Sequence, residues 1–206
     1  MTRKRGKEER CKEPVVLCIS GMAGSGKSTV ARRIAKKYGL KYYSGGDALK
    51  ALAKEEGYEF LEHGWWETPE GMLFLERRGK DPKFDKAVDQ KLLELAKQGN
   101  VVLDSWTMPW LIEKAFKVWL EASPQKRAER IARRDRMHLK EAVSALTNKE
   151  KRTKEIYEEL YGFSLGEDFA PFHLILDTTI LKAEEVFQVL CKVLDNMVIH
   201  SCNVSE

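Results

Sequence analysis

An apolar run that leads directly into a glycine-rich loop is the most constraining feature of the sequence. Residues 15–20 are apolar enough to form a buried parallel strand, and residues 21–28 read Gly-Met-Ala-Gly-Ser-Gly-Lys-Ser. The spacing of Gly, four residues, Gly, Lys and Ser is the pattern of a phosphate-binding loop. Apolar residues at helical spacing follow over residues 28–38. A strand, a glycine loop and a helix in this order predict an α/β fold that binds a nucleotide phosphate.

Each part of the loop predicts a separate contact. The glycines let backbone N–H groups surround a phosphate chain, and the helix N-terminus directs partial positive charge toward it. Lys27 can reach the outer phosphates, and the Ser28 hydroxyl can be a ligand of Mg²⁺. A simple turn would need neither residue at the start of a helix. The residues predicted to bind the nucleotide are Gly21, Met22, Ala23, Gly24, Ser25, Gly26, Lys27, Ser28 and Thr29.

The composition is that of a folded protein of one domain. The chain has 206 residues, of which 43% are hydrophobic and 33% charged, with a net charge of +4. It contains no run of about 18 apolar residues and no apolar segment behind its charged N-terminus, so we expect neither a membrane span nor a secretory signal. The four cysteines lack metal-binding spacing, which favours reduced thiols. We therefore expect a cytoplasmic protein.

The two ends of the chain differ from its body. Residues 1–13 carry mixed charge and almost no apolar side chains, which predicts a flexible basic tail. Glu8, Glu9 and Glu13 dilute its positive charge, so nucleic-acid binding is the less favoured interpretation. We expect residues 14–200 to form a single domain and residues 201–206 to form a second tail. The oligomeric state is left open.

Strands and helices alternate along the body of the chain. The predicted strands are residues 15–20, 40–43, 101–104, 116–122 and 173–177. The predicted helices are residues 28–38, 44–57, 82–98, 125–134, a polar stretch that reaches residue 161, and residues 183–197, with residues 58–82 irregular or helical. This alternation predicts a five-stranded parallel sheet with helices on both faces. In such sheets the ligand lies at the carboxyl ends of the strands.

Polar residues follow the second and third predicted strands. Asp104 ends the strand expected beside the first one, where a carboxylate can orient Mg²⁺ through water or contact a phosphoryl acceptor; capping a helix is the alternative. Ser44, Asp47 and Lys50 follow the second strand, and Asp47 has the same two interpretations. Asp85 and Asp89 stand one helical turn apart. They face the acceptor or are ordinary surface carboxylates.

A basic segment follows the fourth strand. Arg127, Arg130 and Arg134 are spaced by three and four residues and share one helix face, with Arg133 at its border. They form either a lid that closes over a transferring group and excludes water, or a solvated helix face. Given the phosphate loop, we favour the lid, with Arg130 and Arg134 as the catalytic candidates beside Lys27 and Asp104.

Taken together, these residues resemble the nucleoside monophosphate kinases, most closely the short cytidylate kinases of the archaeal type. The resemblance covers roughly residues 14–195. It is carried by the loop and its helix, residues 43–47, residues 84–89 with 95–102, residues 127–135, and residues 157–162. It implies a three-layer P-loop NTPase fold with an acceptor-binding insert at about residues 44–98 and a helical lid at about residues 125–162. It also implies transfer of the γ-phosphate of ATP to CMP or dCMP, with Mg²⁺ between Ser28 and Asp104.

The sequence departs from this pattern on the acceptor side. The family has arginine shortly after the carboxylate of the third strand, where this chain has Ser105 and Trp106. Lys50 and Lys149 also stand where the family has arginine, and lysine offers a point charge in place of a two-pronged fork. Lys50, Arg77 or Arg78 would have to compensate. The predicted acceptor-binding residues are Ser44, Asp47, Lys50, Asp104 and Trp106.

Four of the five tryptophans fall on the acceptor side, and they either stack on a base or pack within the protein. These residues are Trp65, Trp66, Trp106 and Trp110. The departures leave two alternatives to a nucleoside monophosphate kinase. One is a kinase of this fold with another small acceptor, such as an alcohol. The other is a nucleotide-binding regulator or slow NTPase without a small-molecule acceptor.

Overall fold

The computed structural model describes residues 14–59 and 65–200, and both predicted tails, residues 1–13 and 201–206, lie outside the described residues. The strands are β1 (Val16–Ser20), β2 (Lys41–Ser44), β3 (Val101–Asp104), β4 (Phe116–Glu121) and β5 (Leu174–Asp177). They form one parallel sheet in the order β2-β3-β1-β4-β5, which confirms the predicted five-stranded sheet. Because β1 lies between β3 and β4, the glycine loop leaves the sheet near its middle.

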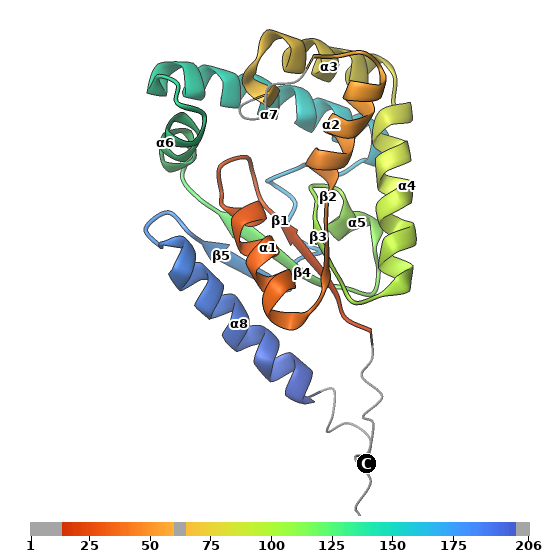
Figure 1. The fold of residues 1–206 in the computed structure, drawn as a ribbon, viewed down its shortest axis with the longest axis vertical. Coiled ribbons are helices and arrows are strands. Elements are labelled where there is room, and N and C mark those ends of the chain that lie inside the picture. Colours follow the sequence, from red (N-terminus) through yellow and green to blue (C-terminus); the bar gives the residue numbers. More distant parts are fainter. Residues whose placement is uncertain (1–13, 60–64, 201–206) are drawn as a thin grey trace, which may run out of the picture.

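The helices form a layer on each face of the sheet and a third group above its carboxyl edge (Figure 1). They are α1 (Lys27–Tyr38), α2 (Gly45–Glu55), α3 (Pro69–Lys80), α4 (Lys83–Gln98), the short α5 (Met108–Leu111), α6 (Pro124–Asp135), α7 (Leu139–Tyr161) and α8 (Ala183–His200), with a 3₁₀ turn at Trp65–Glu67. Residues 58–82 were expected to be irregular or helical, and residues 69–80 of this segment form α3. Thr68 caps α3 and Pro69 begins it, a combination that favours a helix start.

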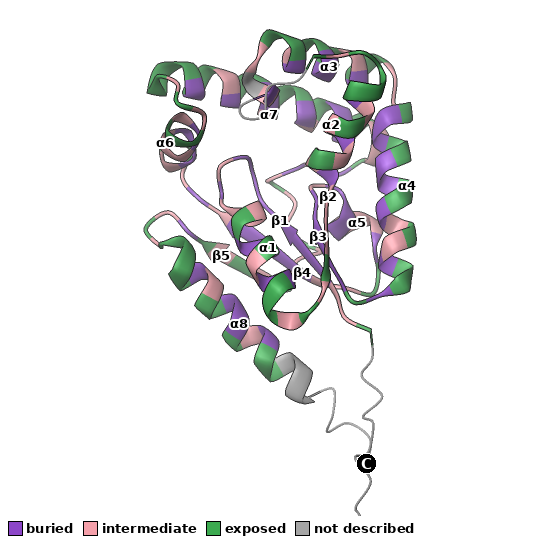
Figure 2. Cartoon of the chain, viewed as in Figure 1, coloured by how far each residue is buried: buried purple, intermediate pink, exposed green. Residues whose placement is uncertain are grey.

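Alternating side chains of β1 explain the two packed faces. Leu17 and Ile19 pack with α1 and α8, whereas Cys18 faces the cluster formed by α2, α4 and α5. All three side chains are at most 1% exposed. A strand buried on both faces is apolar throughout, which is why residues 15–20 read as a continuous hydrophobic run. Figure 2 shows β1 and its neighbours β3 and β4 coloured mainly as buried.

The basic segment after β4 stands over the glycine loop. Ser123 caps α6, its hydroxyl accepting from the backbone N–H of Lys126 at 3.3 Å. Ala128 and Ile131 of α6 pack with Ala142 of α7 and with Ala23 of the loop. Farther along, α7 packs against α3. The glycine loop, α6, α7 and α3 therefore all lie at the carboxyl end of the sheet (Figure 1).

Two properties of the described residues bear on the sequence-based expectations. Cys18 and Cys191 are buried free thiols, and Cys11 and Cys202 lie in the tails outside the described residues. Within residues 14–59 and 65–200, no helix combines the length and apolar character needed to cross a membrane.

Gly71, in the first turn of α3, provides a test of this packing. A Cβ atom there would lie 2.1 Å from the carbonyl oxygen of Trp65. We expect Gly71→Ala to lower the free energy of unfolding by about 1–3 kcal/mol, because the 3₁₀ turn must move away from α3. Urea unfolding at equilibrium measures the change.

The matched control is Gly46→Ala in the first turn of α2. A Cβ atom there meets only Ser44 Oγ, at 3.7 Å. Its free energy of unfolding should equal or slightly exceed that of the wild type, since alanine favours a helix over glycine. Equal destabilisation by the two substitutions would contradict the close approach at Gly71.

Candidate active site

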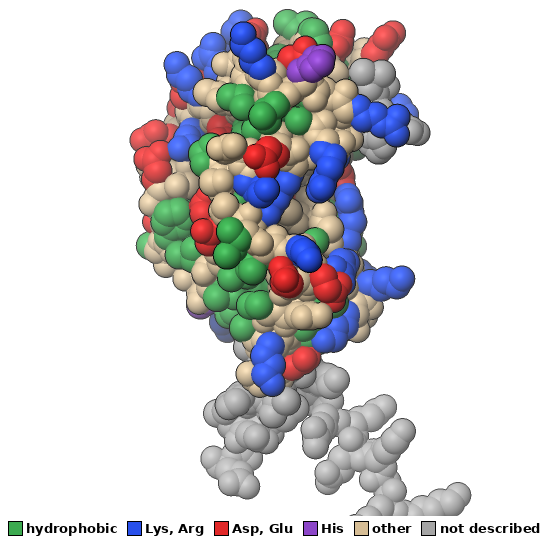
Figure 3. Space-filling model, turned by 90° about the vertical axis from the view of Figure 1, so that its left-hand side faces the viewer, with side chains coloured by type: hydrophobic (Ala, Val, Ile, Leu, Met, Phe, Trp, Pro, Cys, Tyr) green, Lys and Arg blue, Asp and Glu red, His purple; other side chains and the backbone are tan. Residues whose placement is uncertain are grey.

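A cavity of about 1510 Å³ lies at the carboxyl ends of the strands. It runs from the loop between β5 and α8, past the glycine loop and α6, to the side chains of α3 and α4. Seen from the side of α6 and α8, Lys and Arg side chains gather in the middle of this face, next to a hollow (Figure 3). The position matches the ligand site expected for a parallel sheet.

The glycine loop is shaped by close contacts with α6. Gly24 has φ +80°, and a Cβ atom there would lie 2.7 Å from the carbonyl oxygen of Arg127. Gly26, with φ +96°, is the N-cap of α1. Residues 23–29 line the cavity, whereas Gly21 and Met22 are buried behind it. The loop thus presents the start of α1 to the cavity, as the motif predicts.

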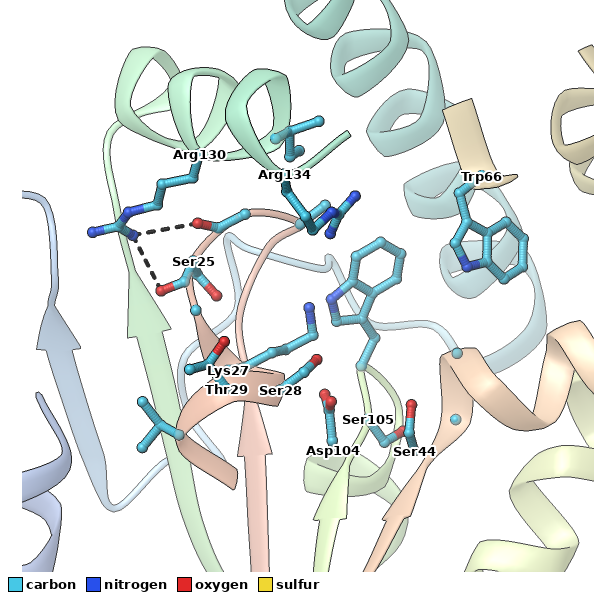
Figure 4. A pocket seen from close by; sticks show the side chains of 18 of the residues that line it. Ser25, Lys27, Ser28, Thr29, Ser44, Trp66, Asp104, Ser105, Arg130 and Arg134 are labelled. Carbon is cyan, nitrogen blue, oxygen red and sulfur yellow. Dashed lines mark hydrogen bonds between the residues drawn. The ribbon is translucent and has the colours of Figure 1, made fainter. Parts of the chain in front are cut away.

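Lys27 lies at the first turn of α1 and points into the cavity (Figure 4). Burial lowers the pKa of Lys27; the negative charge of Asp104 opposes this shift, and the positive charge of Arg134 adds to it. Lys27 and Arg134 thus place two positive charges close together, which favours an anionic ligand. Because the Lys27 side chain already points into the cavity, its amine can neutralise the charge of a bound phosphate without a change of orientation.

Asp104 ends β3 next to β1, in register with Ile19, and is 2% exposed. Tyr42 of β2 donates to Asp104 Oδ2 at 2.9 Å. Burial and the charge of Asp104 raise the pKa of Tyr42, which keeps it a donor. Because α5 has Thr107 as its N-cap, the helix-capping interpretation of Asp104 is wrong. Tyr42 was missed by sequence reasoning, since its contact depends on the register of β2 and β3.

The N-cap of α2 is Ser44, whose hydroxyl accepts from the backbone N–H of Asp47 at 3.1 Å. The capping interpretation of Asp47 is therefore wrong as well. Its carboxylate pairs with Arg32 at 3.1 Å on an exposed surface at the edge of the cavity. Ser44 stands in register with Asp104, and Lys50 of α2 also lines the cavity. Ser44, Asp47 and Lys50, which follow β2 and were predicted to bind the acceptor, thus all line the cavity that contains Lys27.

Trp106 takes the place where the family pattern has arginine. Its Nε1 donates to the carbonyl oxygen of Gly21 at 2.6 Å, and its ring centroid lies 5.4 Å from Lys27 Nζ. The indole is thereby held against the donor loop, with Lys27 over its ring. Trp66 lines the cavity farther from the loop (Figure 4). Trp65 is a buried core residue, and Trp110 stacks on Phe163 at 4.0 Å, so these two provide packing.

Arg127 is buried, which makes the solvated-face interpretation wrong for this residue. Its guanidinium donates to the carbonyl oxygens of Ala122 and Ala23, at 3.1 and 3.2 Å, and pairs with Glu150 of α7. This arginine therefore joins β4, the glycine loop and α7.

Arg130 and Arg134 differ in their contacts. Arg130 donates to the carbonyl oxygens of Gly24, Ser25 and Thr178, at 3.3, 3.2 and 2.6 Å, and so braces the glycine loop against the loop after β5. Arg134 extends from α6 toward Lys27, and it also bonds to Asp135 (Figure 4). In this arrangement the charge of Arg134 acts on Lys27.

The far end of the cavity contains charges that the sequence did not distinguish from surface residues. Arg78 of α3 forms a buried bidentate ion pair with Asp85, at 3.0 and 2.6 Å. Asp89 accepts from Thr107 Oγ1 and from the hydroxyl of Tyr161, each at 2.6 Å. Asp85 and Asp89 are 3% and 6% exposed, so the surface interpretation of both is wrong.

Arg77, the neighbour of Arg78, instead pairs with Glu56 outside the cavity. The two arginines differ by one position on α3, and a helix places adjacent residues on different faces. Lys149 of α7 lines the cavity with its amine 5.1 Å from the ring of Trp66. Arg78 and Lys149 are therefore the basic residues of the far end.

Ser28 and Asp104 have the donor atoms that suit Mg²⁺. Figure 4 shows both side chains facing the same space beside Lys27. No group of three or more His, Cys, Asp or Glu side chains suited to a metal occurs in residues 14–59 and 65–200. A hydroxyl and a carboxylate fit a magnesium ion that keeps several waters and is also bound by substrate phosphates.

The fold and the cavity together define the class of P-loop kinases, in which a helix N-terminus faces the donor phosphates. The family described as cytidylate kinase-like matches residues 16–180. A cytidylate kinase from Pyrococcus horikoshii is 32% identical over 187 residues, 90% of this chain and 91% of that protein. The chain belongs to the cytidylate kinase-like family, and it is a kinase. The resemblance found in the sequence is confirmed.

Other relatives agree with this assignment. A cytidylate kinase from Methanocaldococcus jannaschii is 29% identical over 188 residues, 89% of this chain and 99% of that protein. Among solved structures, a shikimate kinase from Bacteroides thetaiotaomicron superposes with a TM-score of 0.54 at 18% identity, covering 89% of this chain and 99% of that one. At this identity the shared feature is the fold.

Asp89 should make stability depend on pH. Burial raises the pKa of Asp89 from 3.8 to about 6, so the folded protein binds this proton more tightly than the unfolded chain. Its contribution to the free energy of unfolding is present in full below about pH 4 and is lost as pH rises through about 6. By linkage the loss is roughly 2–3 kcal/mol.

We expect Asp89→Asn to lack this loss, because an amide does not titrate and can still bond to Thr107 and Tyr161. Urea unfolding of both proteins between about pH 4 and pH 8 should show the variant gaining stability relative to the wild type as pH rises. Parallel pH profiles would contradict the raised pKa.

Proposed function

We propose that this kinase transfers the γ-phosphate of ATP to a nucleoside monophosphate, with CMP or dCMP as the leading acceptor. The observation that carries the proposal is one cavity with two ends that meet at Lys27 and Asp104. One end is the glycine loop with the loop after β5, and the other is built by α2, α3 and α4. The archaeal relatives are named cytidylate kinases, which supports CMP or dCMP as the acceptor.

On this proposal the transfer depends on positioning and charge neutralisation. An oxygen of the acceptor phosphate attacks the γ-phosphorus, the bond to the bridging oxygen breaks, and ADP leaves. Lys27 neutralises charge on the donor phosphates, and Arg134 approaches the same space from α6. Mg²⁺, held by Ser28 and oriented by Asp104 through water, would supply further positive charge when bound. Tyr42 fixes the Asp104 carboxylate by its hydrogen bond.

We propose residues 125–162 as the lid and residues 44–98 as the acceptor region. In the structure these ranges contain α6 with α7, and α2 through α4. The α6–α7 pair already rests on the glycine loop through Ala23, and closing it further over bound substrates would exclude water. Arg130 would act on the donor side, since its contacts with Gly24 and Ser25 hold the loop that carries the phosphates.

A kinase with a hydroxyl acceptor is the second candidate. It is favoured by one observation, the Ser105–Trp106 pair in place of the arginine that would grip an acceptor phosphate. The proposal of a phosphate acceptor relies instead on Lys50 and on the cations around Lys27. The two candidates differ in which acceptors stimulate release of ADP.

A coupled assay of ADP release tests the proposal. Purified protein is given ATP and Mg²⁺ with each nucleoside monophosphate, each nucleoside, shikimate or gluconate. We expect turnover with CMP, reduced at least 100-fold in Lys27→Ala because the phosphate charge is no longer neutralised. Activity with only a hydroxyl acceptor would transfer the assignment to the second candidate, and ATP hydrolysis that no acceptor stimulates would indicate a regulator.

Arg134→Ala tests the lid. We expect kcat to fall at least tenfold with little change in the KM for ATP, since Arg134 acts mainly on charge that develops during transfer. Steady-state kinetics with varied ATP separates the two constants. Arg152→Ala is the matched control, because Arg152 is exposed on α7 and forms an ion pair with Glu155 of the same helix. Equal losses in kcat and ATP affinity would contradict a lid role for Arg134.

A further inference from the structure

Trp106 follows β3 and stands where the two ends of the cavity meet. On one side of it, Lys27 Nζ of the donor end lies 5.4 Å from the centroid of the indole ring. On the other side, the indole meets the ring of Tyr157 edge to face, with the centroids 6.4 Å apart. Tyr157 in turn accepts a hydrogen bond from Arg78 of the far end at 3.3 Å. The indole is half-buried and lines the cavity, so it forms part of the wall beside the amine of Lys27.

Both the side chain and the backbone hold this indole in place. Its Nε1 donates to the carbonyl oxygen of Gly21 at 2.6 Å. Before it, the backbone N–H of Ser105 donates to the carbonyl oxygen of Ile19 in β1 at 3.3 Å. After it, the backbone N–H of Thr107 donates to Ser105 Oγ at 3.2 Å. These bonds fix the chain on either side of Trp106 as well as the ring itself.

Trp106 also packs against two apolar clusters that border the cavity. One contains Ala23 of the glycine loop and Ile131 of α6, and the other contains Met22 and Leu75 of α3. The indole therefore fills the space between the loop and the surrounding helices with apolar surface. A water molecule is held in a cavity by roughly two to four polar partners, and the carbon edge of an indole provides none.

A kinase has to prevent water from replacing its acceptor. When a water oxygen attacks the γ-phosphorus of ATP, the bond to the bridging oxygen breaks, the water gives up a proton to the solvent, and ADP and inorganic phosphate are released. Water is always present and is far more abundant than any acceptor. The side chains beside the donor phosphates therefore decide how much ATP is lost in this way.

We propose that Trp106 excludes water from the space beside Lys27 and thereby sets the ratio of phosphoryl transfer to ATP hydrolysis. It is a specificity-determining residue, which favours the acceptor over water. The proposal rests on the part of the proposed function that names ATP as the donor, and it holds for a phosphate or a hydroxyl acceptor. Removing the indole would free the carbonyl oxygen of Gly21 and uncover the amine of Lys27, and these two groups can hold a water molecule.

Two rates measured on the same proteins test this inference. At saturating ATP and Mg²⁺, release of inorganic phosphate without an acceptor gives the rate of hydrolysis, and formation of CDP with saturating CMP gives the rate of transfer. We expect Trp106→Ala to raise the ratio of hydrolysis to transfer by about tenfold or more, because water enters the space that the indole filled. Trp106→Phe should raise the ratio less, since a smaller ring still covers Lys27.

The matched control is Trp110→Ala. Trp110 stacks on Phe163 and donates to Asp168 at 2.7 Å, and it is not among the residues that line the cavity. Loss of its indole removes similar packing without opening the space beside Lys27, so its ratio should equal that of the wild type. An equal rise in Trp110→Ala and Trp106→Ala would overturn the inference, because loosening of the protein would then explain both.

Binding of a non-hydrolysable ATP analogue provides a readout that does not depend on turnover. Isothermal titration calorimetry should give Trp106→Phe a Kd within about threefold of the wild type, because the backbone N–H groups that surround the phosphates are unchanged. Loss of binding in both Trp106 variants would overturn the inference, since the indole would then support the loop itself. Should Trp106→Ala not fold, the comparison of Trp106→Phe with the wild type decides.

The outcomes separate this inference from the proposed function. Transfer to CMP with the same ratio in the wild type and the Trp106 variants would overturn the water-excluding role and leave the proposed function standing. Faster hydrolysis in Trp106→Ala, with no nucleoside monophosphate phosphorylated by any of the proteins, would support the role and overturn the proposed acceptor. Absence of all ATP turnover in the wild type and the variants would overturn the two together.

Discussion

The buried guanidinium of Arg127 is the contact on which the donor side of this kinase depends. It bonds to the backbone before α6, to the glycine loop at Ala23 and to Glu150 of α7. Gly24 lies so close to the backbone of Arg127 that no side chain fits between them. The shape of the phosphate loop and the positions of α6 and α7 are therefore coupled, because one guanidinium on α6 bonds both to the loop and to α7.

The two ends of the cavity differ in charge. Around the glycine loop, the positive charges of Lys27 and Arg134 lie close together, which favours an anion. Across the cavity, Arg78 is already paired with Asp85, and the charges are balanced. A gradient from excess positive charge to neutrality suits a substrate with an anionic head and a neutral ring. The orientation of a nucleotide acceptor would then follow from charge before any specific hydrogen bond forms.

Much of the donor side could be predicted from sequence, because its signals are local. The loop pattern, the buried strand before it and the caps of α1 and α6 each lie within a few consecutive residues. The far end could not be predicted in this way. Asp85 and Asp89 have the spacing of an ordinary amphipathic helix, and their burial arises only when α3 and α7 pack against α4. The Tyr42–Asp104 bond likewise depends on strand register. Contacts between segments that are distant in the chain leave no pattern in a short stretch of the sequence.

Trp106 links the two sides of the cavity and bears on where substrate choice is made. An arginine at this place would add a cation beside Lys27 and Arg134, whereas the indole stabilises Lys27 through its ring and bonds to Gly21. On the proposed function, an acceptor phosphate would therefore have fewer positive charges around it than in the family pattern. Binding energy that the phosphate does not provide must come from the remainder of the acceptor. The far end, where Asp89 and Arg78 hold fixed donors and acceptors, is the part of the cavity able to supply it.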